Sequence, residues 1–170
     1  SSKDAKRLTW FEIDQSGRTE NKGVDTILAI ANTESSFVAK LDKKQKVILA
    51  KDYKKEPKKF GPGIFAKMIV ATLNKFEINA TKLIIDTEYS QKYDKLLTTT
   101  IEKEYPQISI YIRSIGETKS PAHQAAYLTA TKKTNKKEAV ANSILKGFLA
   151  SELRHHECLR GSVSPHCLTS

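Results

Sequence analysis

The chain has 170 residues, of which 39% are hydrophobic and 28% charged, a balance typical of one globular domain and unlike that of a disordered chain. Its apolar runs, such as Ile64 to Leu73, are shorter than the roughly 20 residues that a bilayer-spanning helix needs. Residues 1–7 lack the apolar stretch of a secretory signal. We therefore expect a cytoplasmic protein without a membrane partner.

The net charge is the second global feature. It amounts to +10, which favours polyanionic partners, and nucleic acid is the commonest large polyanion in a cell. Lysines that only keep a surface soluble would give the same total. The charge is concentrated, however, because residues 40–60 contain nine lysines against Asp42, Asp52 and Glu56. This concentration predicts a basic patch.

The first part of the chain is predicted to form an antiparallel meander. Four short runs rich in β-branched or aromatic residues are typical of strands: Leu8 to Asp14, Thr26 to Asn32, Ser36 to Leu41 and Lys46 to Ala50. Gly17, Gly23 and a lysine run separate them, and glycine favours tight turns.

From Gly61 onward, helices and strands alternate. Apolar residues first recur every three or four positions, which predicts an amphipathic helix, and the run Lys82 to Asp86 then predicts a buried strand. The elements expected next are a helix capped by Ser90 and ended by Pro106, a strand at Ile108 to Arg113, a helix that starts at Ser120 and Pro121, and a last helix at Lys137 to Leu153.

Strands that alternate with helices require crossover connections and therefore pair in parallel. We expect an α/β fold with a mixed β-sheet, an antiparallel meander followed by parallel strands, flanked by α-helices. The domain is expected to span residues 8–153, with an N-terminal extension at 1–7 and a C-terminal tail at 154–170.

Two of the predicted strands end in an acidic residue, Asp14 and Asp86. Either residue could simply form a turn, but the expected topology brings both strand ends to the middle of the sheet, where ligands of α/β sheets gather. Carboxylates that lie close together repel each other unless a cation lies between them, and oxygen ligands suit Mg²⁺ or Mn²⁺. Such ions activate water against a phosphodiester. The pair therefore predicts metal-dependent phosphodiester hydrolysis.

Two segments resemble type 2 and type 3 ribonucleases H. IDQSGR (Ile13 to Arg18) resembles their opening motif, in which a strand ends in an acidic pair followed by a small residue, glycine and arginine. GETKSPAHQAAYLTA (Gly116 to Ala130) is similar to their later motif, in which an acid precedes an alanine-rich helix. The resemblance implies a ribonuclease-H-like domain with Asp14, Asp86 and Glu117 as catalytic metal ligands.

The chain departs from this pattern at two positions. Gln15 stands where the family's second acid would be, and Tyr127 stands where a serine is usual. Glu88 either replaces the missing acid as a metal ligand or is a solvated residue near the next helix. His123 is a candidate proton shuttle, with a surface or capping role as the alternative. A second resemblance, to uncharacterised ribonuclease-H-like proteins with an Asp-Ser-Gly opening and a late glutamine matched by Gln124, implies the same fold.

Three functional hypotheses follow. The first is a hydrolase, a metal-dependent endonuclease that cleaves RNA within RNA–DNA hybrids. The second is a catalytically weak or inactive nucleic-acid-binding module of the same fold, and the third is a protein-binding structural domain. The oligomeric state is left open. The basic residues expected to contact nucleic acid are Arg18, Lys58, Lys59, Lys119, Lys132 and Lys133.

The tail poses a separate question. Cys158 and Cys167 lie there with His155, His156 and His166, so the tail either binds Zn²⁺ or is a flexible extension. The spacing matches none of the common paired zinc motifs.

Overall fold

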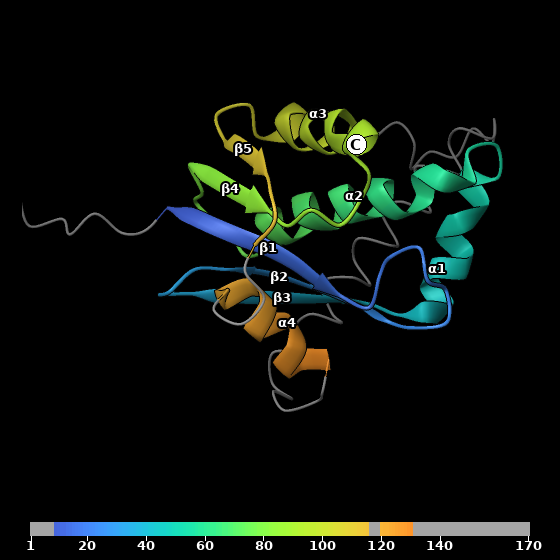
Figure 1. Cartoon of the computed structure of the whole chain (residues 1–170), viewed down its shortest axis with the longest axis horizontal. Helices are drawn as coiled ribbons and strands as arrows, with labels where there is room; N and C mark the ends of the chain where they lie inside the picture. The colour runs from blue at the N-terminus through green and yellow to red at the C-terminus, as the bar shows by residue number, and fades with distance from the viewer. Residues whose placement is uncertain (1–8, 116–119, 131–170) are drawn as a thin grey trace, which may run out of the picture.

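A mixed sheet forms the centre of the protein (Figure 1). The computed structural model describes residues 9–115 and 120–130. Within these residues the sheet has the strand order β3-β2-β1-β4-β5. The first three strands form an antiparallel meander, whereas β4 runs parallel to β1 and β5 runs parallel to β4. The strands are β1 (Trp10–Ser16), β2 (Thr26–Ala31), β3 (Ser36–Leu41), β4 (Lys82–Ile85) and β5 (Ser109–Ile112). The predicted mixed α/β class is confirmed.

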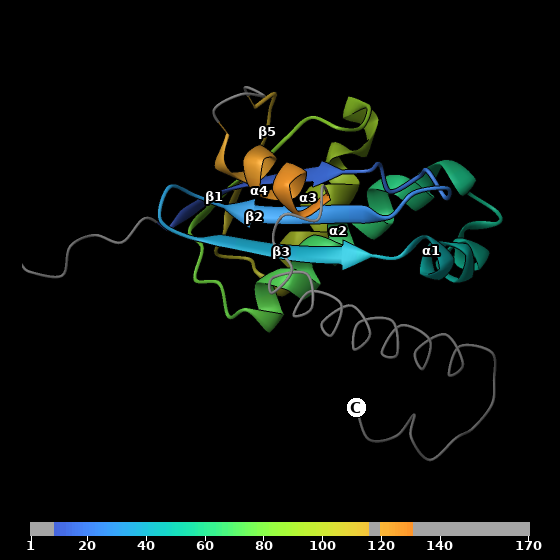
Figure 2. The same cartoon turned by 90° about the horizontal axis from the view of Figure 1, so that it is seen from below.

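Helices cover both faces of this sheet. Helices α2 (Phe60–Lys75) and α3 (Asp94–Glu104) lie on one face, and α4 (Pro121–Ala130) lies on the other (Figures 1 and 2). Strand β2 is buried at every position because it is covered from both sides. The nearly continuous run of apolar residues in β2 is thus explained by burial on both faces of the strand. A strand with one solvent-exposed face would instead alternate apolar and polar residues.

The two faces carry cores of different size. The larger core joins β1, β4, α2 and α3 through residues such as Phe11, Ile13, Phe65 and Leu97. The smaller one is made mainly of small side chains, which allow α4 to approach the strands closely: Ile27, Ala29, Ala31, Val38, Ala122 and Ala126. Because side chains alternate along a strand, Ile13 enters the larger core and Asp14 faces the α4 side.

The predicted strand at Lys46 to Ala50 is wrong. These residues belong to helix α1 (Lys43–Leu49) and to a 3₁₀ turn, η1 (Ala50–Tyr53), followed by η2 (Pro57–Lys59). The reason is a capping box: the Asp42 carboxylate accepts from the Lys44 amide at 2.7 Å, and the Asp42 amide donates to the Gln45 side chain at 3.2 Å. The reciprocal cap offsets the local preference of the β-branched pair Val47 and Ile48.

The elements predicted between Gly61 and Ala130 are present with small shifts. Helix α3 begins at Asp94 after a 3₁₀ turn, η3 (Gln91–Tyr93), and the Ser90 side chain makes no capping hydrogen bond. Helix α4 begins at Pro121, and the Ser120 hydroxyl accepts from the His123 amide at 3.2 Å.

Several predicted features lie outside the described residues. They are the extension at 1–7, the helix at Lys137 to Leu153, the boundary between domain and tail, and the Cys/His tail itself. Among the helices that the structure describes, none combines the length and the apolar character that crossing a membrane requires.

Candidate metal centre

Asp14 and Asp86 lie at the same edge of the sheet on neighbouring strands. Strands β1 and β4 pair in parallel with Ile13 opposite Ile85, so the acid that follows each isoleucine comes next in register. The Asp86 amide extends this pairing by donating to the Ile13 carbonyl at 3.0 Å. The structure thus brings together the two acids whose meeting the strand order predicted.

Glu88 joins them from the segment that follows β4. Ligand oxygens of Asp14, Asp86 and Glu88 all lie within 4.8 Å of one another, close enough to share one cation. Asp14 is buried, and the other two side chains are partly buried. Of the alternatives for Glu88, the structure therefore favours the place beside the acids over a solvated position.

The pKa of Glu88 is raised by its burial and by the two neighbouring aspartates. Burial raises the pKa of Glu88 to about 7, and the hydrogen bond and charge of Asp14, followed by the charge of Asp86, act in the same direction. A hydrogen bond from Gln15 opposes part of the rise. A cation bound between the carboxylates would remove this repulsion, because it favours the charged form of each.

Hydrogen bonds orient the two aspartates. Asp14 accepts from the Gln15 amide at 2.8 Å and contacts His123 Nδ1 through its other oxygen at 2.9 Å. Asp86 accepts from the Ile115 amide at 2.9 Å. Because a carboxylate oxygen has two lone pairs, these contacts leave each aspartate able to bind a cation as well.

His123 reaches Asp14 from the first turn of α4. Ser120 holds this turn in place, since its hydroxyl accepts from the His123 amide and donates to the Glu12 carboxylate of β1 at 2.7 Å. The His123 side chain is 44% exposed. The structure thus puts the candidate shuttle in contact with one of the acids, and its proton-transfer role stays a prediction.

Gln15 contributes in a different way from the acid that the resemblance would put there. Its amide nitrogen donates to the Tyr89 hydroxyl at 3.1 Å, and its amide oxygen accepts from the Thr19 hydroxyl at 2.8 Å. On β1 it also alternates with Asp14 and lies on the face of the larger core. Gln15 therefore joins the end of β1 to the segment that carries Glu88.

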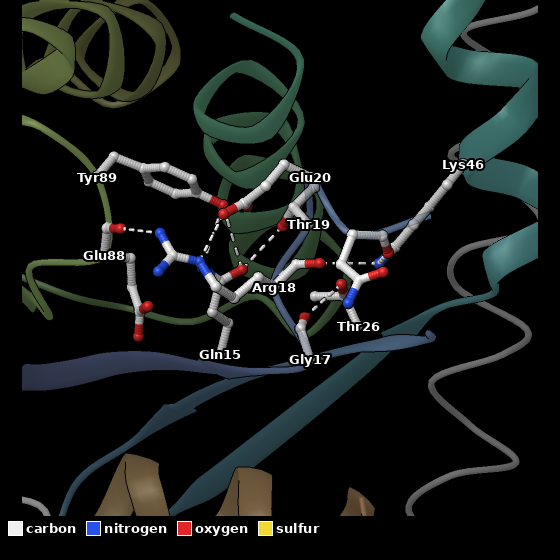
Figure 3. Close-up of polar contacts among 10 residues, drawn as sticks. Gln15, Gly17, Arg18, Thr19, Glu20, Thr26, Lys46, Glu88 and Tyr89 are labelled. Atoms are coloured by element: carbon white, nitrogen blue, oxygen red, sulfur yellow. Dashed lines mark hydrogen bonds and ion pairs between the residues drawn. The ribbon is translucent and has the colours of Figure 1, made fainter. Parts of the chain in front are cut away.

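Arg18 makes contacts within the protein (Figure 3). Its guanidinium donates to the Glu88 carbonyl oxygen, pairs with the Glu20 carboxylate and lies 5.7 Å from the centre of the Tyr89 ring. The side chain is also 55% exposed, so its predicted contact with nucleic acid stays a prediction.

The lysine-rich segment, residues 43–59, leaves the sheet at the same edge as the acids. Strands β1 and β3 both pair antiparallel with β2, so they end at one edge, and α1 follows β3 directly there (Figures 1 and 2). The segment's exposed lysines are Lys43, Lys44, Lys51, Lys54, Lys55, Lys58 and Lys59. Lys59 also pairs with Glu56 at 2.9 Å. The predicted basic patch therefore lies on helical segments beside the acidic edge.

Four of the predicted site residues lie outside the described part of the chain: Glu117, Lys119, Lys132 and Lys133. The sequence reasoning also missed two residues that shape this edge, Tyr89 and Lys46. Tyr89 follows Glu88 directly, and Lys46 follows the capping box on α1, which was the available signal that its run is helical.

Comparison with known proteins adds no relative. No family model matches the chain, no curated protein matches it, and no solved structure matches it. Function is therefore inferred from the geometry of the site.

Proposed function

We propose that this protein is a metal-dependent endonuclease of ribonuclease-H-like fold that hydrolyses phosphodiester bonds of RNA, with RNA–DNA hybrids as the substrate. One observation carries the proposal: the carboxylate of Asp14 at the end of β1 meets those of Asp86 and Glu88, which follow β4, within 4.8 Å at one edge of the sheet. The sheet supports the fold assignment, because an antiparallel meander followed by parallel strands is the arrangement that the family resemblance implies.

The donor set suits a hard cation. Asp14, Asp86 and Glu88 offer only carboxylate oxygens, which Mg²⁺ and Mn²⁺ prefer to soft or nitrogen ligands. When bound, such an ion lowers the pKa of a coordinated water and stabilises charge on a phosphate. Glu117, which the resemblance adds to this set, lies outside the described residues.

The protein's own groups would orient and complement that ion. The hydrogen bonds from Gln15 and Ile115 fix the two aspartates before any ligand arrives. The contact of His123 Nδ1 with Asp14 leaves Nε2 as the ring nitrogen able to exchange a proton with substrate or solvent.

Substrate recruitment is assigned to the lysine-rich segment. Its exposed ammonium groups lie beside the acidic edge, where they would attract phosphates of the substrate. This arrangement separates the roles: lysines supply affinity and the acids hold the ion.

A second candidate follows from Gln15. This amide occupies the place of the family's second acid and is engaged with Tyr89 and Thr19, which favours a nucleic-acid-binding module with weak or no catalysis. The two candidates differ in whether Glu88 supplies the carboxylate that Gln15 does not.

A cleavage assay separates them. A labelled RNA–DNA hybrid is incubated with the full chain and Mg²⁺ or Mn²⁺, beside an Asp14→Asn variant and an EDTA control. The endonuclease proposal expects cleavage by the wild type alone and none in EDTA. Equal cleavage by both proteins would indicate a contaminant and overturn it. Salt-sensitive binding without cleavage would support the binding module instead.

A further inference from the structure

The loop at residues 17–25 is built around the buried ammonium group of Lys46 (Figure 3). Lys46 Nζ donates to the carbonyl oxygens of Arg18 at 3.1 Å, Asn21 at 2.9 Å and Val24 at 2.8 Å. The side chain is 0% exposed. Because an ammonium has three hydrogens, these three acceptors satisfy it completely.

Lys46 remains mainly charged at neutral pH despite its burial. Burial lowers the pKa of Lys46 to about 8, and the negative charges of Asp25 and Glu20 oppose this. The loop thus contains its own cation, held by carbonyl oxygens as a bound metal ion would be.

The ends of the loop are closed around this cation. Gly17 has a φ of +75°, and a Cβ there would lie 2.1 Å from the Asp25 carbonyl oxygen. Only glycine therefore fits where the two ends of the loop come together. The Thr26 hydroxyl donates to the Gly17 carbonyl at 2.6 Å. The backbone of Arg18 is therefore fixed by two contacts. The Thr26 hydroxyl binds the preceding Gly17 carbonyl, and Lys46 binds the Arg18 carbonyl itself.

From this fixed backbone the Arg18 side chain reaches the segment that carries Glu88. This segment lies between the end of β4 at Ile85 and the start of η3 at Gln91, and after the Asp86 amide, which donates to the Ile13 carbonyl, it belongs to no strand or helix. Arg18 donates to the Glu88 carbonyl and lies against the Tyr89 ring, while Gln15 donates to the Tyr89 hydroxyl. Contacts from β1 and its loop thus hold the third acid's backbone.

We propose that Lys46 and Arg18 are positioning residues for Glu88. Lys46 holds the loop at residues 17–25, and the loop presents Arg18 so that it fixes the Glu88 carbonyl and directs the carboxylate toward Asp14 and Asp86. The role assigned to the Glu88 carboxylate rests on the proposed function. The coupling, by which Lys46 and Arg18 restrain the backbone around Glu88, does not. In this proposal Arg18 affects the acidic site through its contact with the backbone carbonyl of Glu88.

Two measurements test the proposal on the full chain. The first is backbone hydrogen exchange of residues 17–25 and 86–90 without metal, and the second is the affinity for Mn²⁺ alone. The variants are Lys46→Met and Arg18→Met. Lys44→Met is the matched control, because Lys44 is an exposed lysine on the same helix. Exchange in β2 reports whether each variant remains folded.

Arg18→Met should accelerate exchange in residues 86–90 by about tenfold and leave residues 17–25 protected. Lys46→Met should accelerate exchange in both segments. Both changes should weaken Mn²⁺ binding by about 10- to 100-fold, as loss of a group that orients a metal ligand does. Lys44→Met should change neither measurement, and Arg18→Lys should recover only part of the loss because it lacks the planar fork.

Unchanged exchange at residues 86–90 in Arg18→Met would overturn the coupling, and this variant is decisive even if Lys46→Met fails to fold. Exchange that increases in residues 17–25 alone in Lys46→Met would limit Lys46 to its own loop and overturn its part. If the wild type binds no Mn²⁺, the proposed metal function fails, while the exchange data still decide the coupling.

Discussion

Lys46 and the acidic group Asp14, Asp86 and Glu88 are both ionisable, and each is wholly or partly buried, but their charges have opposite surroundings. Each hydrogen of the Lys46 ammonium has a carbonyl acceptor, so the charge is satisfied within the fold. The three acids instead lie close together, and burial, reinforced by the hydrogen bond and charge of Asp14 and the charge of Asp86, raises the pKa of Glu88 to about 7. A satisfied buried charge makes a loop rigid, whereas a cluster of like charges remains able to bind a cation.

The largest expected effect comes from removing one charge of the acidic group while keeping its shape. Asp86→Asn can still accept from the Ile115 amide, so the fold should persist. Under the proposed function, cleavage of the RNA–DNA hybrid should fall by about 1,000-fold or more, because a metal ion contributes several kcal/mol of charge stabilisation. Glu102→Gln, which changes an exposed acid on α3, is the control. Comparable losses in both variants would contradict a specific acidic site.

The other side of the comparison is tested by removing the Lys46 ammonium. Lys46→Met leaves three partly buried carbonyls without their donor, and an unsatisfied buried polar group costs about 1–3 kcal/mol. Relief of the ammonium's desolvation offsets part of this, so we expect the free energy of unfolding to fall by about 3 kcal/mol at pH 7. Urea unfolding measures it against Lys44→Met, which should change it by less than about 0.5 kcal/mol. Equal stability of the two variants would show that the carbonyls do not need Lys46.

A smaller effect of opposite sign is expected at Glu88. Its folded-state pKa of about 7 lies above the ordinary 4.5, so the folded protein gains stability from a bound proton below pH 4.5 and loses it as pH rises to about 7. In EDTA at pH 8, Glu88→Gln should therefore be more stable than the wild type by about 2 kcal/mol, with little gain at pH 4. Urea unfolding at both pH values measures this difference.

The same residue should make Mn²⁺ binding depend on pH. Because a metal binds the ionised carboxylate, the affinity of the wild type should increase up to about pH 7 and then level off. Glu88→Gln should bind Mn²⁺ weakly at every pH. A variant that is less stable in EDTA at pH 8, or that binds Mn²⁺ normally, would contradict the picture of a repulsive acidic cluster.

The smallest effect concerns exposed charges of the lysine-rich segment. Replacing Lys58 and Lys59 with Gln should lower the slope of log affinity against log salt for the hybrid by about 2, since each phosphate-contacting lysine contributes about 1. The matched control replaces Lys75 and Lys103, which lie in the last turns of α2 and α3 before β4 and β5 begin, at the opposite edge of the sheet. Equal changes in both double variants would show that the lysine-rich segment is not a preferred path for nucleic acid.

Local patterns account for much of the fold. The continuous apolar run before Asp86 and the three- to four-residue period after Gly61 predicted β4 and α2, because burial on two faces and on one helical face leave different periodicities. The capping box at Asp42 was also readable and shows that the β-branched Val47 and Ile48 did not require a strand.

The strand order read from the sequence correctly predicted that Asp14 and Asp86 meet, since the strands that they end, β1 and β4, pair in parallel and parallel strands end at the same edge of a sheet. Only the tertiary structure decided which other groups join them. His123 contacts Asp14 across 109 residues, Glu88 turns toward the acids from a segment without regular structure, and Lys46 is buried by a loop that precedes it. Such contacts depend on the direction of single side chains after packing, and no local period or propensity encodes that direction.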